Sequence, residues 1–285
     1  MTETTQRVAV AAVGIPLAVA VVYAGGWILA LLIAAIVVAG SLEFYRMAEH
    51  RQARPLIAAG LPLAVAFVLV AAANPQAGPV SFGLVITIAT LVVTALAIWT
   101  RGVEGQPLLS ISTTLTGAVY TGGLLSFGLF LRHLPGVEGA IHGTALVFAP
   151  VLLTWTSDTF AFFVGRRWGR TKLIPRVSPG KTVQGAIGAV VGSVLVAIAY
   201  TRVLEAFPTY RPTMFEGAIF GLAISIVAQI GDLVESLLKR DAGVKDSGKL
   251  LPGHGGALDR FDSLLFTLPL AYLFFRFWVG TGVAG

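Results

Sequence analysis

The chain has 285 residues, of which 56% are hydrophobic and 12% are charged, and its formal net charge is +6. A soluble domain carries about 25% charged residues, so this composition excludes an ordinary water-soluble globule and indicates a polytopic membrane protein. The sequence contains no cysteine, which excludes a disulfide framework, a thiolate metal site and a cysteine nucleophile.

Continuous apolar runs recur along the whole chain. A helix needs about 20 largely apolar residues to span the hydrocarbon core, and these runs do not alternate as strands would. The first run is too long for a signal-peptide core, and a second follows almost at once, so we expect it to remain as a span. The sequence predicts an all-α protein with about nine transmembrane helices, at residues 8–23, 27–41, 56–73, 80–99, 108–131, 144–164, 183–204, 215–230 and 263–279.

Lysine and arginine are distributed unequally between the two sides that nine spans define. Most of them lie in the N-terminal segment and in the loops at residues 42–55, 100–107, 165–182 and 231–262, which share one side. Cytoplasmic loops carry an excess of Lys and Arg. We therefore expect the N-terminus in the cytoplasm and the C-terminus on the outer side of a bacterial inner membrane. Basic cytoplasmic loops also account for the net charge more simply than nucleic-acid binding does.

The two halves of the chain differ in polar content. Residues 1–140 offer apolar helices and short turns without a polar constellation, and we expect them to form a scaffold and to shape a lipid site. Residues 141–285 hold two long basic loops, at 165–182 and 231–262, and are expected to be catalytic. Pairs of small residues four apart predict closely packed helices in this half: Gly188 with Gly192, and Gly217 with Gly221.

Two pairs of carboxylates lie at the two ends of the stretch 231–262, where the eighth predicted span ends and the ninth begins. Asp232 and Glu235 are three residues apart and share one helix face, and Asp259 and Asp262 repeat this spacing. Two such pairs at adjoining helix ends would repel one another without a positive partner. Mg²⁺ commonly takes one or two carboxylates together with substrate phosphates, so the pattern predicts a magnesium site.

Basic residues and glycines separate these acids. The cations can neutralise phosphate oxygens, and Gly255 and Gly256, which follow His254, allow the backbone to approach a ligand. Together these groups indicate phosphoryl or nucleotidyl transfer. The plainer alternative is an ordinary charged cytoplasmic loop. The cations expected to neutralise phosphate are Lys239, Arg240, Lys245 and Arg260.

A second polar stretch runs from Ser157 to Gly185. Asp158 lies about 10 Å inside the predicted end of its helix, where an ionisable side chain is a candidate functional group or else a buried structural acid paired with a neighbouring helix. The following loop is basic and contains no acid, which topology control or attraction to lipid headgroups also explains. The segment 178–182 combines the hydroxyls of Ser178 and Thr182 with a turn and Lys181, so we expect it to bind a substrate phosphate.

The stretch from Ser236 to Asp262 resembles the signature of phosphatidate cytidylyltransferases, also called CDP-diacylglycerol synthases. The stretch 157–182 is similar to a second region typical of that family. Two positions depart from the pattern: Ala257 replaces a larger aliphatic residue, and Gln184 stands where the family usually has Glu. The residues that match the signature are Ser236, Leu238, Lys239, Arg240, Lys245, Asp246, Gly248, Leu251, Pro252, His254, Gly255, Gly256, Asp259, Arg260 and Asp262.

This resemblance implies that the phosphate of phosphatidate attacks the α-phosphorus of CTP, with Mg²⁺, alone or together with K⁺, as cofactor. It also implies a homodimer and the metal ligands Asp232, Asp259 and Asp262. With the patterns above, it predicts a catalytic set and a substrate-binding set. The catalytic set is Asp232, Lys239, Arg240, Lys245, Asp246, His254, Asp259, Arg260 and Asp262. The substrate-binding set is Asp158, Ser178, Lys181, Thr182, Ser236, Gly255 and Gly256.

Two other functions compete with this interpretation. A CTP-dependent enzyme acting on another lipid phosphate would need the same polar groups. An ion-coupled transporter would also place acids at membrane depth, but transporters tend to do so near the midplane, on broken helices of repeated halves. The acids here gather at the cytoplasmic end of one half, which disfavours transport.

Overall fold

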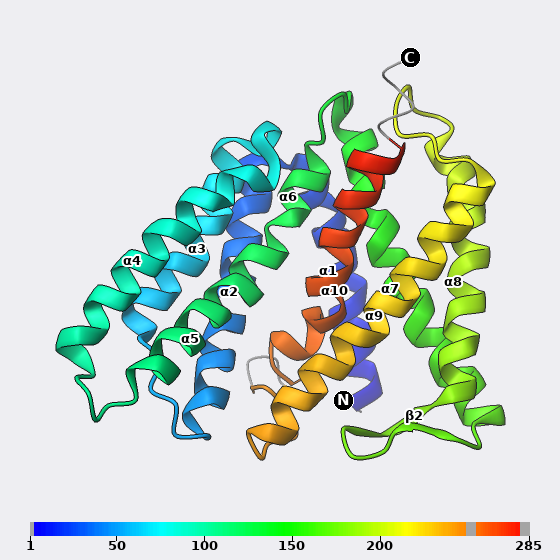
Figure 1. Ribbon diagram of the computed structural model, residues 1–285. Helices are drawn as coiled ribbons and strands as arrows, with labels where there is room; N and C mark the ends of the chain where they lie inside the picture. Colours follow the sequence, from blue (N-terminus) through cyan, green and yellow to red (C-terminus); the bar gives the residue numbers. More distant parts are fainter. Residues whose placement is uncertain (1–2, 249–254, 280–285) are drawn as a thin grey trace. The chain divides into compact units, whose positions relative to one another are not determined.

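The computed structural model describes residues 3–248 and 255–279, and they are almost entirely helical (Figure 1). Each of the nine predicted spans lies in a helical segment. Among the described residues, seven helices are long and apolar enough to cross a membrane, while Gly14–Ala24 and Ile57–Ala73 are apolar but shorter. The protein is an all-α polytopic membrane protein, as the sequence predicts; the number of spans and their orientation stay predictions.

The chain forms two compact units. The first comprises residues 1–130 and 238–261, and the second comprises residues 131–237 and 262–285. The segment 238–261 is thus grouped with the N-terminal helices, whereas the division of the sequence at residue 140 places it in the catalytic half.

The first unit consists of helices joined by short turns. Its core forms where α2, α3 and α5 approach one another. The elements are α1 (Glu3–Ala24), α2 (Gly26–Glu49), α3 (Ile57–Ala73), the 3₁₀ helix η1 (Pro75–Ser81), α4 (Phe82–Thr100), α5 (Pro107–Ala118), the π-helix η2 (Val119–Gly123) and the start of α6 (Phe127–Arg132).

Tyr45 of α2 lies at the centre of this core. Its side chain is fully buried, and its hydroxyl donates to the carbonyl oxygen of Thr114 at 2.9 Å. Gly60 on α3 and Gly117 on α5 lie so close to the ring that a Cβ at either position would overlap it. These two glycines therefore let three helices close around one aromatic side chain.

The second unit contains the longest helices and the β-structure of the described residues. Its helices α9 and α10 each extend by one end into the first unit. The elements are α7 (Gly139–Trp168), β1 (Lys172–Ile174), β2 (Ser178–Thr182), α8 (Val183–Leu204), α9 (Met214–Asp241), α10 (Leu258–Leu273) and the π-helix η3 (Phe274–Val279).

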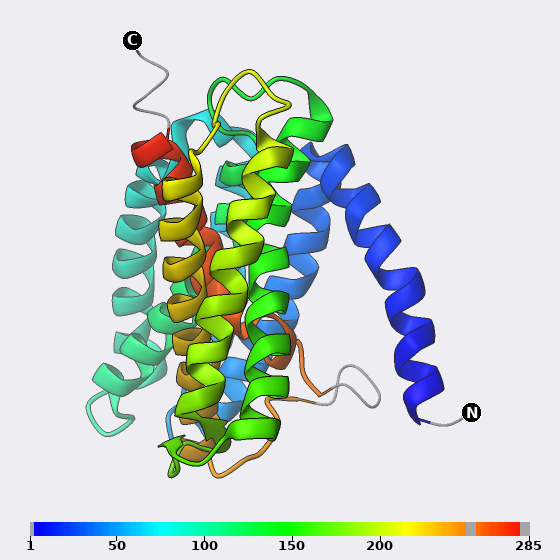
Figure 2. The same cartoon turned by 90° about the vertical axis from the view of Figure 1, so that its right-hand side faces the viewer.

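Helices α7 and α8 run side by side in both views of the fold (Figures 1 and 2). Gly188 of α8 faces Val164 of α7, and Gly192 faces Phe160, each so closely that a Cβ would overlap its neighbour. The second predicted pair, Gly217 with Gly221, does the same on α9 against α8. The prediction that these small residues serve helix packing is confirmed.

The basic loop after α7 folds as a β-hairpin, which the sequence did not predict. Strands β1 and β2 are antiparallel, with Lys172 opposite Thr182 and Ile174 opposite Ser178. The hairpin returns the chain to the start of α8, and so holds Lys181 close to the helix ends.

The orientation can be tested with a pair of fusions. A reporter enzyme that is active only outside the cytoplasm should be active after Gly285, because nine spans precede it. The same reporter should be inactive after Asp241, which eight spans precede. A fluorescent protein that folds only in the cytoplasm should give the reverse pattern. Outer-side activity after Asp241 would contradict the nine-span topology.

Candidate active site

An ion pair joins the basic hairpin to α9 in the second unit. The Lys181 ammonium lies 2.5 Å from a carboxylate oxygen of Asp232, and the two side chains are 24% and 33% exposed. They line a pocket of about 580 Å³, which holds charges of both signs next to the hairpin. The polar residues of its lining are Asp158, Arg166, Lys172, Lys181, Thr182, Gln229 and Asp232.

Asp158 reaches this pocket from α7. The helix continues to Trp168, so Asp158 lies well before its last turn. Its side chain is exposed in the described chain and lines the pocket, rather than being buried as a structural acid. It is also close enough to Asp232 and Lys181 to interact with both charges. The structure thus brings together three side chains that the sequence predicted separately.

Two side chains fix the hairpin to the start of α8. The Thr182 hydroxyl accepts the backbone N–H of Gly185 at 3.1 Å and caps the helix. The Gln184 side-chain oxygen accepts the N–H groups of Arg170 and Thr171 at 3.0 and 3.2 Å. A glutamate, which the family pattern has at this position, would supply the same kind of acceptor. The departure at Gln184 therefore preserves the hydrogen-bond acceptor and removes one negative charge.

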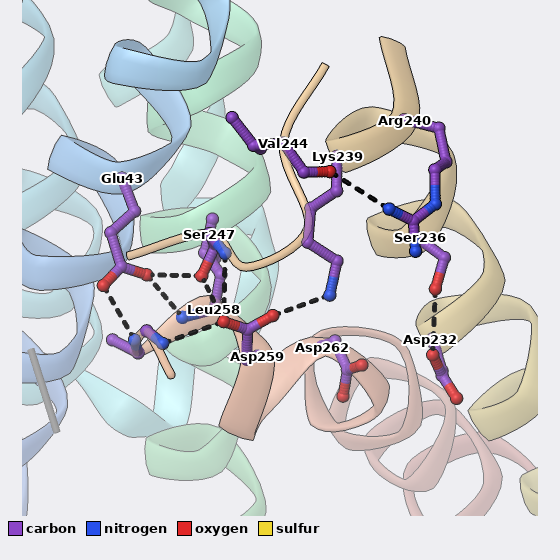
Figure 3. Close-up of polar contacts among 12 residues, drawn as sticks. Glu43, Asp232, Ser236, Lys239, Arg240, Val244, Ser247, Leu258, Asp259 and Asp262 are labelled. Carbon is purple, nitrogen blue, oxygen red and sulfur yellow. Dashed lines mark hydrogen bonds and ion pairs between the residues drawn. The ribbon is translucent and has the colours of Figure 1, made fainter. Parts of the chain in front are cut away.

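Asp259 lies at a second polar centre, within the first unit (Figure 3). One carboxylate oxygen accepts from the Lys239 ammonium at 2.6 Å. The other accepts the N–H of Gly256 at 2.8 Å, and the N–H and hydroxyl of Ser247 at 3.0 Å each. The Lys239 and Asp259 side chains are only 12% and 11% exposed. Asp259 therefore forms an ion pair and also ties Ser247 to Gly256.

Glu43 of α2 belongs to the same centre, and the sequence analysis missed it. Its side chain is 4% exposed. Its carboxylate accepts the Ser247 hydroxyl and the N–H groups of Ala257 and Leu258, each at 2.9 Å (Figure 3). The only sequence signal for Glu43 was a single acid after an apolar run, and such an acid does not by itself indicate a partner.

The glycines of this loop make room for these carboxylates. A Cβ at Gly248 or Gly256 would overlap the Glu43 carboxylate, and a Cβ at Gly255 would lie 2.8 Å from an oxygen of Asp259. Gly255 also has a φ of +80°, which glycine adopts without strain. The sequence predicted that Gly255 and Gly256 admit a ligand. Packing against the protein's own acids accounts for them, and their contact with substrate stays a prediction.

Two neighbouring acids of α9 have different surroundings. The Ser236 hydroxyl donates to Asp232 at 3.3 Å, one turn along the helix. Glu235 shares a face with Asp232 by its spacing, but its side chain is fully buried. The helix continues to Asp241, so Asp232 lies inside α9 rather than at its end, and of these two acids it is the one that lines the pocket.

The remaining predicted residues make other contacts or are exposed. Arg240 donates to the carbonyl oxygen of Val244 at 3.2 Å, and the Asp262 carboxylate accepts the N–H of Ser263 at 2.6 Å. Ser178 begins strand β2. His254 lies outside the described residues. Lys245, Asp246 and Arg260 are solvent-exposed, as are Arg240 and Asp158.

The placement of the carboxylates bears on which of them could hold a magnesium ion. In residues 3–248 and 255–279, no group of three or more His, Asp or Glu side chains is arranged to hold a metal ion. Asp158 and Asp232 provide two carboxylates on one pocket, a set that suits Mg²⁺ when substrate phosphates complete its coordination. The predicted repulsion between acids is relieved by lysines, with Lys181 at Asp232 and Lys239 at Asp259.

Comparison with known proteins places the chain in a family. The model of the Cytidylyltransferase family matches residues 5–278. The chain belongs to this family. The phosphatidate cytidylyltransferase of Synechocystis sp. is 36% identical over 95% of this chain and 96% of its own length. The chloroplastic phosphatidate cytidylyltransferase 4 of Arabidopsis thaliana is 35% identical over 93% of this chain and 71% of its own. The family resemblance stated from the motifs is confirmed over nearly the whole chain.

The hairpin anchor of this cytidylyltransferase can be tested at Gln184. Gln184→Leu removes the acceptor for two backbone N–H groups, each worth about 1 kcal/mol, so the hairpin should open more often. Trypsin should then cleave after Arg170, Lys172 or Arg176 several times faster than in the unmodified protein. Gln184→Glu keeps the acceptor and should leave cleavage unchanged. Equal cleavage rates for the Leu variant and the unmodified protein would show that Gln184 does not anchor the hairpin.

Proposed function

We propose that this chain is a phosphatidate cytidylyltransferase, which transfers CMP from CTP to phosphatidate and forms CDP-diacylglycerol and pyrophosphate. The observation that carries the proposal is the pocket where Asp158, Lys181 and Asp232 meet. Two relatives that match more than nine tenths of this chain bear this enzyme's name, which supports the same assignment. An acidic pair with adjacent cations, set among apolar helices, suits a substrate that is a phosphate on a lipid.

The charges of the pocket match the needs of this reaction. A phosphate oxygen of phosphatidate forms a bond to the α-phosphorus of CTP, and the bond to pyrophosphate breaks. The attacking oxygen already carries negative charge, so no strong general base is required. The protein must instead hold two anions in line and neutralise them. Lys181, Arg166 and Lys172 line the pocket and can supply positive charge to phosphate oxygens.

Mg²⁺ is the proposed cofactor. Asp158 and Asp232 would hold it, and when bound it would neutralise and orient phosphate oxygens of CTP. Asp259 and Asp262 are further proposed ligands, and K⁺ is the proposed second cation; both assignments rest on the family resemblance. The hydrogen bonds of Asp259 to Ser247 and Gly256 favour a role in which this carboxylate also fixes its own loop.

The membrane setting supports a cytoplasmic reaction. CTP is a cytoplasmic nucleotide, and the basic hairpin lies on the side that the positive-inside rule assigns to the cytoplasm. We therefore propose an inner-membrane enzyme whose active site faces the cytoplasm. The homodimer is retained as a proposal from the family resemblance alone.

The reaction is tested with purified protein in detergent micelles. Incubation with phosphatidate, labelled CTP and Mg²⁺ should give a labelled lipid and pyrophosphate in equal amounts, and EDTA should abolish both. Labelling of a polyprenyl phosphate or an ether-lipid phosphate, but not of phosphatidate, would favour the rival lipid substrate. No labelled lipid under any Mg²⁺ or K⁺ condition, together with substrate uptake into vesicles, would favour a transporter.

The roles of Asp232 and Asp259 can be distinguished by how the activity of their variants depends on Mg²⁺. Asp232→Asn removes a charge from a partly exposed pocket, so it should lower kcat by at least about 100-fold, shift Mg²⁺ activation to higher concentration and leave Tm nearly unchanged. Asp259→Asn should lower both kcat and Tm, because its carboxylate also accepts hydrogen bonds from Ser247 and Gly256.

Glu235→Gln is the matched control, because Glu235 lies on the same helix but is buried. It should leave the Mg²⁺ dependence of turnover unchanged. Near-normal turnover in Asp232→Asn would remove Asp232 from the proposed metal site.

A further inference from the structure

The Glu43 carboxylate connects α2 to a segment more than 200 residues later in the sequence. One oxygen accepts the N–H of Ala257, and the other accepts the N–H of Leu258 and the hydroxyl of Ser247. The first N–H groups of a helix have no acceptor within the helix, and they carry the positive end of its dipole. Glu43 therefore anchors the beginning of α10 from another helix.

Glu43 and Asp259 divide the same set of donors between them. Three consecutive backbone N–H groups point at these acids: that of Gly256 at Asp259, and those of Ala257 and Leu258 at Glu43. The two carboxylates thus fix the entry into α10 from two directions. Displacing Glu43 would release two of the three N–H groups and allow the first turn, which carries Asp259, to rotate.

The Ser247 hydroxyl lies between the same two acids. Its oxygen is 2.9 Å from Glu43 and 3.0 Å from Asp259. A hydroxyl has one proton to donate, so it can serve only one carboxylate at a time. When a more strongly positive partner approaches Asp259, the Ser247 hydroxyl can rotate and donate its proton to Glu43 instead. The Asp259 oxygen that Ser247 leaves can then accept from that partner without movement of the helix.

We propose that Glu43 is a positioning residue for the cytidylyltransferase reaction. It acts through Ser247 and the first turn of α10 to set the orientation of the Asp259 carboxylate. Glu43 itself is buried and does not touch substrate. The inference rests on the proposed function, in which Asp259 acts on the cation or the phosphates.

The test compares Glu43→Gln with Glu49→Gln, an exposed glutamate on the same helix. Glutamine places a donor NH₂ group against one of the N–H or O–H groups from which Glu43 accepts a hydrogen bond. Glu43→Gln should therefore lower kcat about 10- to 100-fold, the range seen when a residue behind a metal ligand or catalytic group is changed. It should also raise the Mg²⁺ concentration for half-maximal activity, while the KM for CTP changes less than kcat. Glu49→Gln should change none of these values.

A double-mutant cycle tests whether Glu43 acts through Ser247. Ser247→Ala should lower kcat in the same direction, and the double variant should be little worse than Glu43→Gln alone, because residues of one network are not additive. Glu43→Asp, which keeps the charge on a shorter side chain, should recover part of the lost turnover. Fully additive losses would overturn action through Ser247.

Hydrogen–deuterium exchange separates failure of this inference from failure of the proposed function. Peptides covering residues 255–262 should take up deuterium faster in Glu43→Gln than in Glu49→Gln, whatever reaction the protein catalyses. Unchanged uptake, or normal kcat and Mg²⁺ dependence in folded Glu43→Gln, would overturn the positioning role. If Glu43→Gln does not fold, Ser247→Ala decides, and normal turnover and Mg²⁺ dependence in that variant would overturn the proposal. A wild-type protein without CTP-dependent activity would instead refute the proposed function.

Discussion

The removal of carboxylates from water is the constraint on which both polar centres of this protein depend. An acid among apolar helices is stable only when hydrogen bonds or an opposite charge replace its hydration. Lys181 does this for Asp232, Lys239 does it for Asp259, and backbone N–H groups with a serine hydroxyl do it for Glu43. The first contact attaches the hairpin to α9, the second joins α9 to α10, and the third attaches Ser247 and the start of α10 to α2. The interactions that stabilise these carboxylates thus also hold the segments of the two polar centres in place.

The helices and the main site residues could be predicted because their signals are local. Hydropathy over a window of about 20 residues locates a span wherever it lies in the fold, and all nine predicted segments are helical. Asp158, Lys181 and Asp232 were recognisable because each is a polar group in or beside an apolar run. Their meeting in one pocket could not be deduced, since spacing along the chain does not say which helices are neighbours.

Glu43 and the hairpin were missed for related reasons. The partners of Glu43 lie more than 200 residues away, and two of them are backbone N–H groups that no side-chain pattern reveals. The strands of the hairpin are too short for alternation to be seen, and the contact that holds Arg170 and Thr171 comes from the side chain of Gln184. The glycines at 248 and 256 were visible in the sequence. Their packing against Glu43 required knowing that an acid from α2 reaches the loop.

The two lysine–aspartate pairs differ in solvent exposure, and this difference indicates that they have different roles. Lys239 and Asp259 are nearly buried, so separating them would leave a charge in a medium that solvates it poorly. Lys181 and Asp232 are two to three times more exposed, and water and salt weaken their attraction. The Lys181 ammonium can therefore leave Asp232 for a phosphate oxygen at small cost when a cation takes its place at the carboxylate. Such an exchange would let Lys181 and Asp232 neutralise each other when the pocket is empty and still allow the pocket to bind an anion and a cation together. The buried pair instead fixes Lys239 of α9 against Asp259 of α10, and Glu43 holds Asp259 through Ser247.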